Sequence, residues 1–252
     1  MVTRDVVDGL LVSVLPDADA AADAAAGHAA AALDEAVADR GSAVILAATG
    51  ASQVRLLARL VENVSAPWDR VTLLHLDEFV GLLPDDPRSF AAFVRRHFTD
   101  IVRPGAVSFL DGSAADPVAE AERYEALLRG QEVDVCLLGL GENAHLAFNE
   151  PGATDFADPR WVKVVSLAPE TVRQHVRQGL FDAGSAPRRA ITVTIPAILA
   201  SRHVVAVAAE TRKADAVRCA VRGPVTPECP ASALRLARDA ALFVDEDAAA
   251  LL

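Results

Sequence analysis

The 252-residue sequence is poor in the residues that mark disulfide-rich, zinc-binding or nucleic-acid-binding proteins. It has only three cysteines, Cys136, Cys219 and Cys229. They are too few and too irregularly spaced for a disulfide framework, and no CxxC pair indicates zinc. We therefore expect all three thiols to be reduced, with Cys136 buried in a strand. Basic residues number 24 against 35 acidic ones, a formal net charge of −11. This charge disfavours nucleic acid and anionic membranes as partners, because both attract clustered lysine and arginine.

Long apolar runs are also missing. The N-terminus, MVTRDVVDG, lacks the basic segment and apolar core of a signal peptide, and charged residues interrupt the alanine-rich run over residues 18–32. We therefore predict no membrane span and a cytoplasmic protein. Apolar residues make up 52% of the chain and charged residues 23%, the balance of a globular protein. No linker or repeat marks a boundary, so we predict a single domain over residues 1–252, with two smaller domains as the alternative.

Short apolar runs alternate with longer segments of helical periodicity. The short runs predict strands at 44–48, 71–76, 133–138 and 204–208. The longer segments predict helices at 17–40, 52–63, 89–102, 117–129 and 212–221. This alternation predicts an α/β fold with a mostly parallel sheet and helices on both faces. Ligands of such sheets bind outside the carboxyl ends of the strands, so polar residues at those ends are the candidates for a site.

The first predicted strand runs into the turn Thr49-Gly50-Ala51-Ser52 and then a helix. A glycine lets the backbone turn tightly, and a helix start offers free N–H groups and the positive end of the helix dipole. These features favour a phosphate site, to which Thr49 and Ser52 would add hydroxyl donors. The same turn also fits an ordinary serine N-cap, so this alternative stays open.

Two further strand ends carry acid/base candidates. Asp77 and Glu78 directly follow the second predicted strand, and adjacent residues of an extended chain point to opposite sides. One carboxylate can therefore face the crevice as a general base while neighbours hold the other, although a solvated acidic turn is the alternative. The third strand leads into GLGENAHLAFNEP, in which His145 and Glu150 can form an oriented acid/base pair. A purely structural loop histidine is the alternative here.

Taken together, the segments ATGASQ, LDEFVGL, GLGENAHLAFNEP and AITVTIP resemble the glucosamine-6-phosphate deaminase and 6-phosphogluconolactonase superfamily. The resemblance extends in order from about Leu46 to Asp245. The deaminase (isomerase) branch is the more similar, because DEFVGL and AFNEP look like its DEYVGL and AFNEP, whereas lactonases typically carry SLFP after the histidine. The joint occurrence of the four segments is specific, whereas any one of them is not.

The resemblance implies a Rossmann-like α/β fold and a deaminating isomerase that needs no organic cofactor and no metal. Its substrate would be a small-molecule sugar phosphate, first of all glucosamine 6-phosphate, which reacts with water to give fructose 6-phosphate and ammonia. Family members assemble in different ways, so a homo-oligomer is possible.

The resemblance also implies roles for individual residues. Asp77 looks like the base that moves a proton between C2 and C1, and His145, oriented by Glu150, looks like the group that opens the sugar ring. The residues implied to contact substrate or its phosphate are Thr49, Gly50, Ala51, Ser52, Glu78, Arg177 and Lys213. Arg177 shares a helix face with Arg173, so the alternative to a phosphate contact is a solvated basic face. For Lys213 the alternative is an ordinary exposed lysine.

The chain departs from the family pattern beside the histidine. Where the superfamily usually reads Asp-Gly-His, this sequence has Asn143-Ala144-His145. Asparagine can orient the imidazole but cannot supply the negative charge that favours its protonated form. We therefore expect Asn143 to alter the acid/base chemistry of ring opening. Because Ala144 replaces a glycine, we expect no positive φ at this position.

Three other functions compete with the deaminase hypothesis. A sugar-lactone hydrolase like 6-phosphogluconolactonase would use His145 to activate water and would not need Asp77. A related sugar-phosphate isomerase, acting on a galactosamine or an unaminated sugar, would keep the acid/base groups. The third is a sugar-phosphate sensor without catalytic activity, and Asn143 is the only feature of the sequence that favours it.

Overall fold

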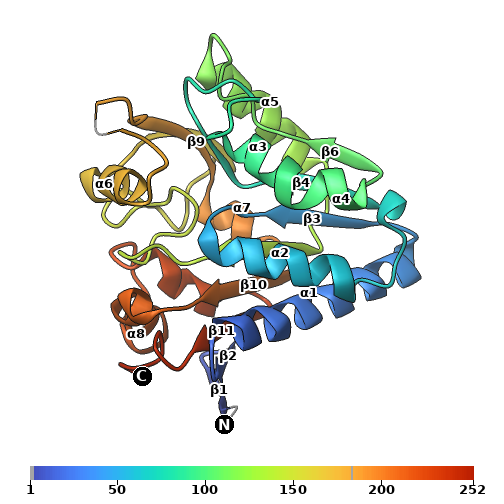
Figure 1. Ribbon diagram of the computed structural model, residues 1–252, viewed down its shortest axis with the longest axis vertical. Helices are drawn as coiled ribbons and strands as arrows, with labels where there is room; N and C mark the ends of the chain where they lie inside the picture. The colour runs from blue at the N-terminus through green and yellow to red at the C-terminus, as the bar shows by residue number, and fades with distance from the viewer. Residues whose placement is uncertain (1–2, 183) are drawn as a thin grey trace.

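The computed structural model describes residues 3–182 and 184–252, which are built around an eight-stranded sheet (Figure 1). In spatial order the strands are β1 (Thr3–Val7), β2 (Leu10–Leu15), β11 (Ala240–Asp245), β10 (His203–Ala208), β7 (Val135–Gly139), β3 (Ala43–Ala47), β4 (Val71–His75) and β6 (Ala106–Ser108). All neighbouring strands are parallel except β1 and β2, which form an antiparallel hairpin. The predicted mostly parallel sheet is therefore confirmed.

Helices cover both faces of this sheet, because its strand residues alternate between two apolar clusters. Ile45 and Leu73 pack with α1 (Ala18–Arg40) and α2 (Ala51–Asn63), which cross one face side by side (Figure 1). Leu46 and Leu74 point to the opposite face, which is covered by α5 (Pro117–Arg129), α7 (Ile195–Leu199) and α8 (Ala214–Arg222). Helices on both faces explain why the strands are continuous apolar runs.

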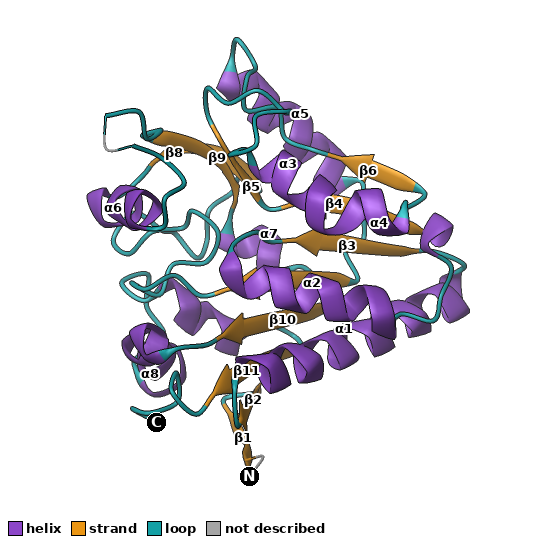
Figure 2. Ribbon diagram, viewed as in Figure 1, coloured by secondary structure: helices purple, strands orange, loops and turns teal. Residues whose placement is uncertain are grey.

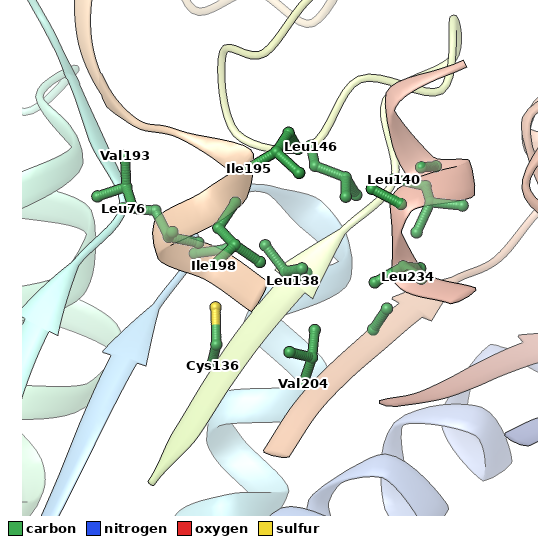
Figure 3. Close-up of a cluster of buried hydrophobic side chains, with 14 of the residues drawn as sticks. Leu76, Cys136, Leu138, Leu140, Leu146, Val193, Ile195, Ile198, Val204 and Leu234 are labelled. Atoms are coloured by element: carbon green, nitrogen blue, oxygen red, sulfur yellow. The ribbon is translucent and has the colours of Figure 1, made fainter. Parts of the chain in front are cut away.

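The second cluster anchors the loops that follow the strands (Figure 3). Leu138 of β7 packs with Ile195 and Ile198 of α7, and Leu140 and Leu146 from the loop after β7 join the same cluster. Each side chain of this size contributes about 1.5–3 kcal/mol when it is fully buried. The loop after β7 is therefore held in place by apolar packing at both ends.

A second, three-stranded antiparallel sheet was not predicted from the sequence. It consists of β5 (Asp77–Phe79), β9 (Arg189–Val193) and β8 (Val162–Ser166), in that order. Helix α6 (Pro169–Arg177) follows β8 and stands at the same end of the molecule (Figure 2). Since β5 begins one residue after the buried Leu76, this sheet starts where the main sheet ends.

The predicted helix over 89–102 is divided in the structure. It consists of α3 (Phe90–Val94), a π-helical turn (Arg95–Thr99) and α4 (Asp100–Val102). Short 3-10 helices occur at Trp68–Arg70, Thr211–Lys213 and Pro230–Leu236. Across the described ranges, 3–182 and 184–252, no helix has the length and apolar character needed to cross a membrane.

One expectation about the cysteines is wrong. Cys219 of α8 and Cys229, just before the 3-10 helix Pro230–Leu236, form a disulfide with a Cα–Cα distance of 6.3 Å. Cys136 is free and buried in β7, as expected. The turn after α8 brings together two cysteines separated by 10 residues, and the spacing alone did not reveal this proximity. Only the folded path of the chain identifies the pair.

Candidate active site

Four neighbouring parallel strands, β10, β7, β3 and β4, end at one edge of the main sheet. The arrowheads of β3 and β10 point toward the side on which α6 and α8 lie (Figure 2). Each of these strands leads into one of the polar segments singled out in the sequence. Parallel strands thus bring to one edge residues that are up to about 160 positions apart, and this edge is where ligands of such sheets bind.

The turn after β3 leaves the N-terminus of α2 without a side-chain cap. Gly50 is the N-cap residue, with φ of 105°, and no side chain of the described residues caps the first turn. The alternative of a serine N-cap is therefore wrong, since Ser52 already lies inside the helix. A Cβ placed on Gly139 would lie 3.0 Å from Ser52 Oγ, so the turn packs directly on the end of β7. The uncapped N–H groups remain available to an anion.

Asp77 and Glu78 have opposite environments, as their alternation along the chain predicts. Glu78 is buried, and its carboxylate accepts hydrogen bonds from the backbone N–H groups of Phe79 (2.9 Å), Phe90 (3.0 Å) and Ala91 (2.8 Å). It thereby caps α3. These bonds give Glu78 a structural role, while its predicted contact with substrate stays a prediction.

The Asp77 side chain, by contrast, has no hydrogen-bond partner among the described residues. Asp77 is only 6% exposed. Burial, reinforced by the negative charge of Glu78, raises the pKa of Asp77 well above its ordinary value. A carboxylate with free lone pairs and a raised pKa is a stronger base than an ordinary exposed carboxylate.

Strand β9 joins the Asp77 segment to the loop after β7. Thr192 lies opposite Asp77 in the β5–β9 pair, and its hydroxyl accepts a hydrogen bond from the N–H of Phe148 at 3.1 Å. The side-chain amide of Asn149 donates to the carbonyl of Val193 at 2.9 Å. Two successive residues of β9 therefore fix the position of the loop that carries His145 relative to Asp77.

Asn143 stands between His145 and Glu150. Asn143 Oδ1 lies 2.8 Å from His145 Nδ1, and Asn143 Nδ2 donates to Glu150 Oε2 at 3.0 Å. His145 Nδ1 and Glu150 Oε2 are themselves 3.6 Å apart. Burial alone would raise the pKa of Glu150, but its interactions with His145 and Asn143 outweigh burial and lower that pKa to about 2. Glu150 is therefore a carboxylate at neutral pH.

Glycine is required at one position beside this network. A Cβ on Gly141 would lie 2.3 Å from Nδ1 of His145, a distance that no side chain tolerates. The N–H of Gly141 donates to the carbonyl of His145 at 2.9 Å, which closes the loop on itself. The absence of a side chain at Gly141 thus allows the imidazole to lie against the end of β7.

The expectation for Ala144 is wrong, because its φ is +66°. A left-handed conformation at a residue with a Cβ costs roughly 1–2 kcal/mol. The loop holds it through hydrogen bonds at both ends of the residue: Ala144 N–H donates to Gly141 at 3.1 Å, and Ala231 N–H donates to the Ala144 carbonyl at 2.9 Å. The loop therefore keeps the backbone shape that glycine would adopt more easily.

Two predicted cations lie at the rim of the same edge. Lys213 is half-buried and its ammonium donates to the Leu140 carbonyl at 2.7 Å, so the alternative of an exposed lysine is wrong. Burial lowers the pKa of Lys213 to about 8. Arg177, the last residue of α6, donates to Glu142 at 2.8 Å. Arg173 pairs instead with Glu170 on its own helix, so only Arg177 contacts the loop after β7.

The structure adds two residues for which no role was predicted. Glu142 contacts Arg177, and its Oε1 also lies 3.6 Å from Arg212. His175 of α6 packs edge-on against Phe79 with ring centroids 5.1 Å apart. Burial and the neighbouring His145 lower the pKa of His175 to about 4. Glu142 follows Gly141 in the loop just after a predicted strand, which is a usable sequence signal, whereas nothing in the helix pattern distinguishes His175.

The fold and the site define an α/β protein with acid/base groups beside an uncapped helix start. One edge of the parallel sheet gathers a buried carboxylate, a histidine coupled to a second carboxylate, an uncapped helix start and two cations. Within residues 3–182 and 184–252 there is no cluster of three or more His, Cys, Asp or Glu side chains that could hold a metal ion.

Comparison with known proteins identifies the family. The family model for glucosamine-6-phosphate isomerases/6-phosphogluconolactonase matches residues 16–243. A glucosamine-6-phosphate deaminase of Rhodopirellula baltica is 39% identical over 248 residues, covering 96% of this chain and 95% of the relative. One from Exiguobacterium sibiricum is 42% identical over 183 residues, covering 72% of this chain and 71% of the relative. The chain belongs to this family, which confirms the resemblance seen in the sequence.

Solved structures agree with this assignment. A structure described as a monomeric glucosamine-6-phosphate deaminase matches with a TM-score of 0.86 and 31% identity, covering 96% of this chain and 99% of the other. The 6-phosphogluconolactonase of Leishmania guyanensis matches with a TM-score of 0.78 and 24% identity, covering 94% and 96% of the two chains. The lactonase shares the fold, and this likeness shows nothing about the activity of the present protein.

Proposed function

We propose that this protein is a glucosamine-6-phosphate deaminase, which converts glucosamine 6-phosphate and water into fructose 6-phosphate and ammonia. Relatives of that name are 39% and 42% identical to the chain. The single observation that favours this reaction over lactone hydrolysis is the Asp77 carboxylate, which is buried and has no hydrogen-bond partner in the described part of the chain. Isomerisation needs a base that carries a proton between two carbons, whereas hydrolysis of a lactone needs only an activated water.

Asp77 is the proposed carrier of this proton. In the open-chain sugar its carboxylate takes the proton from C2 while the aldehyde oxygen O1 gains a proton, which gives an enolamine. The carboxylate then returns its proton to C1 while the nitrogen gives up one proton, which balances the proton gained by O1. The imine then left at C2 adds water and releases ammonia, so the ketose forms with no net loss of protons from the enzyme. The raised pKa of Asp77 suits both steps, because the group has to accept and give up one proton at nearly neutral pH.

His145 and Glu150 are the proposed pair for opening the sugar ring. His145 would hand a proton to the ring oxygen, while the ionised Glu150 stabilises the protonated imidazole. Asn143 contacts both groups and would orient the imidazole through its Nδ1 atom, leaving Nε2 for the sugar. The three side chains thus act as one unit in this proposal.

The phosphate is proposed to bind at the start of α2. The turn formed by Thr49, Gly50, Ala51 and Ser52 offers backbone N–H groups and hydroxyls, and the first turn of α2 has no acidic residue. Lys213 and Arg177, which both contact the loop after β7, would add positive charge. An uncapped helix start beside two cations favours a dianion in an otherwise acidic protein.

The test is a measurement of ammonia release from amino-hexose 6-phosphates, with hydrolysis of 6-phosphogluconolactone followed in parallel. We expect ammonia from glucosamine 6-phosphate and a loss of about 10²–10⁴-fold in kcat for Asp77→Asn, the usual contribution of a general base. Asp215→Asn, an exposed acid of α8, is the matched control and should retain activity.

Two results would contradict the proposal. Hydrolysis of the lactone without ammonia release, unaffected by Asp77→Asn, would assign the chain to the lactonase reaction. Tight binding of hexose phosphates with no turnover of any of them would indicate that the protein is a sugar-phosphate sensor. A preference for another amino sugar would keep the mechanism and change only the substrate.

A further inference from the structure

Glu142 is an acidic side chain placed among the cations of the anion site. Its Oε2 accepts a hydrogen bond from Arg177 of α6 at 2.8 Å, and its Oε1 lies 3.6 Å from Arg212. Its charge also acts on the neighbouring Lys213. The contact with Arg177 joins residues 35 positions apart, and among the described residues it is the only ion pair between α6 and the loop after β7.

A carboxylate and a phosphate bind a guanidinium in the same way, through two oxygens that face its N–H groups. Arg177 and Lys213 are the two cations assigned above to the sugar phosphate, so this inference rests on the proposed function. In the free protein the Glu142 carboxylate therefore already accepts the hydrogen bond of Arg177 that the phosphate would need. Both anions cannot take the same N–H groups of Arg177 at once.

We propose that Glu142 is an internal competitor of the substrate phosphate and thereby a specificity-determining residue. In the free protein its carboxylate holds Arg177, and a phosphate dianion displaces it. An uncharged sugar has no group to make the exchange, so the carboxylate selects for phosphorylated ligands. Because Glu142 lies next to Asn143, the exchange takes place beside the proposed acid/base network.

The exposure of the pair is consistent with such an exchange. The Arg177 side chain is 60% exposed and that of Glu142 27% exposed, and ion pairs that water reaches are weak. A dianion that also receives the N–H groups of α2 makes more hydrogen bonds than Glu142 does. Phosphate can therefore displace the carboxylate, while the carboxylate still lowers the affinity for phosphate by a few-fold.

The chain offers a matched control on the same helix. Glu170 pairs with Arg173, and both side chains are more than half exposed. The substitutions Glu142→Gln and Glu170→Gln each remove one negative charge, but only the first frees Arg177. General electrostatic attraction of phosphate would affect both variants alike, whereas competition affects only Glu142→Gln.

The test is calorimetric titration of the full-length protein with inorganic phosphate at fixed pH and ionic strength. We expect Kd to fall about 2–5-fold in Glu142→Gln, the range of exposed ion pairs, and to stay unchanged in Glu170→Gln. In an Arg177→Ala background the gain from Glu142→Gln should disappear, because the contested cation is gone.

Several results would overturn the inference. An unchanged Kd in Glu142→Gln, or an equal fall in both glutamine variants, would exclude competition for Arg177. Weaker binding in Glu142→Gln would show instead that Glu142 positions Arg177 for phosphate. If the wild-type protein bound no phosphate, the anion site itself would be wrong, whereas phosphate binding without ammonia release would overturn only the deaminase proposal.

Discussion

Asn143 connects the two groups proposed to open the sugar ring. Its amide has one acceptor and one donor end, and it turns the acceptor toward His145 Nδ1 and the donor toward Glu150 Oε2. An aspartate at this position would present an acceptor to both neighbours. The amide thus allows Glu150 to remain ionised close to Asn143 without repulsion between carboxylates.

The substitution Asn143→Asp tests this reading. It places a second carboxylate about where Asn143 Nδ2 now lies 3.0 Å from Glu150, and two carboxylates so close disfavour joint ionisation. The added negative charge also favours the protonated imidazole of His145. We expect the pH profile of kcat/KM for ammonia release to move to higher pH by about one unit, the effect of a close, shielded charge.

The control is Asn143→Ala, which removes both hydrogen bonds and adds no charge. It should lower kcat without moving the profile to higher pH. An identical pH profile in the wild type and in Asn143→Asp would show that the residue beside the histidine does not set the protonation state used in the reaction.

At the scale of elements, helix α3 depends on the carboxylate of Glu78. Three backbone N–H groups, those of Phe79, Phe90 and Ala91, donate to it inside the protein. Such bonds to a charged acceptor are each stronger than bonds between neutral groups. Because Glu78 also raises the pKa of Asp77, the same side chain stabilises a helix and adjusts the neighbouring site.

We expect Glu78→Gln to lower the free energy of unfolding by about 1.5–3 kcal/mol, since the amide turns at least one donor toward a backbone N–H. It should also move the Asp77-dependent limb of the activity profile to lower pH, because the charge that raises the pKa of Asp77 is lost. Urea denaturation and a pH–rate profile measure the two effects. Glu62→Gln on the exposed face of α2 is the control, and an equal loss of stability there would contradict the capping role.

The elements that the sequence predicted well are those whose pattern is local. The strands β3, β4, β7 and β10 are apolar runs between periodic segments, and the structure has all of them within about two residues of the predicted bounds. In the small sheet of β5, β9 and β8, strand β5 pairs with β9 more than 100 residues later in the chain, and no local pattern encodes that pairing.

The candidate site divides in the same way. The polar residues at the strand ends were visible in the sequence, because parallel strands bring their carboxyl ends together. The bridging position of Asn143 depends on side-chain geometry, and the positive φ of Ala144 is held in part by a hydrogen bond from Ala231, 87 residues later in the chain. The contact of Arg177 with Glu142 likewise required the fold, since nothing in either segment indicates the other.

At the scale of the whole molecule, the disulfide fastens the C-terminal part of the chain to the site. Cys219 lies in α8, which follows Lys213, and Cys229 lies in the segment whose Ala231 donates to Ala144. In the same segment, the carbonyl of Pro227 accepts a hydrogen bond from Gly152 at 3.4 Å. The covalent link therefore connects the helix behind Lys213 with the segment that supports the loop of His145.

The number of free thiols per chain tests this covalent state. With the pair oxidised, titration in denaturant without reductant should give one thiol, Cys136, and three after reduction, provided that lysis and denaturation are carried out without oxygen. Three thiols before reduction would contradict the disulfide and agree with a reducing cytoplasm, where such bonds are rare.

In the chain-entropy model, closing a loop of this size stabilises the protein by about 3 kcal/mol, so Cys219→Ser should lower the free energy of unfolding by about that amount in the oxidised protein. Under reducing conditions the variant and the wild type should unfold alike, which separates the effect of the covalent link from that of the side chain. The bond also holds the segment that supports Ala144, and its removal should therefore raise amide exchange in residues 141–152 more than in the strands of the main sheet.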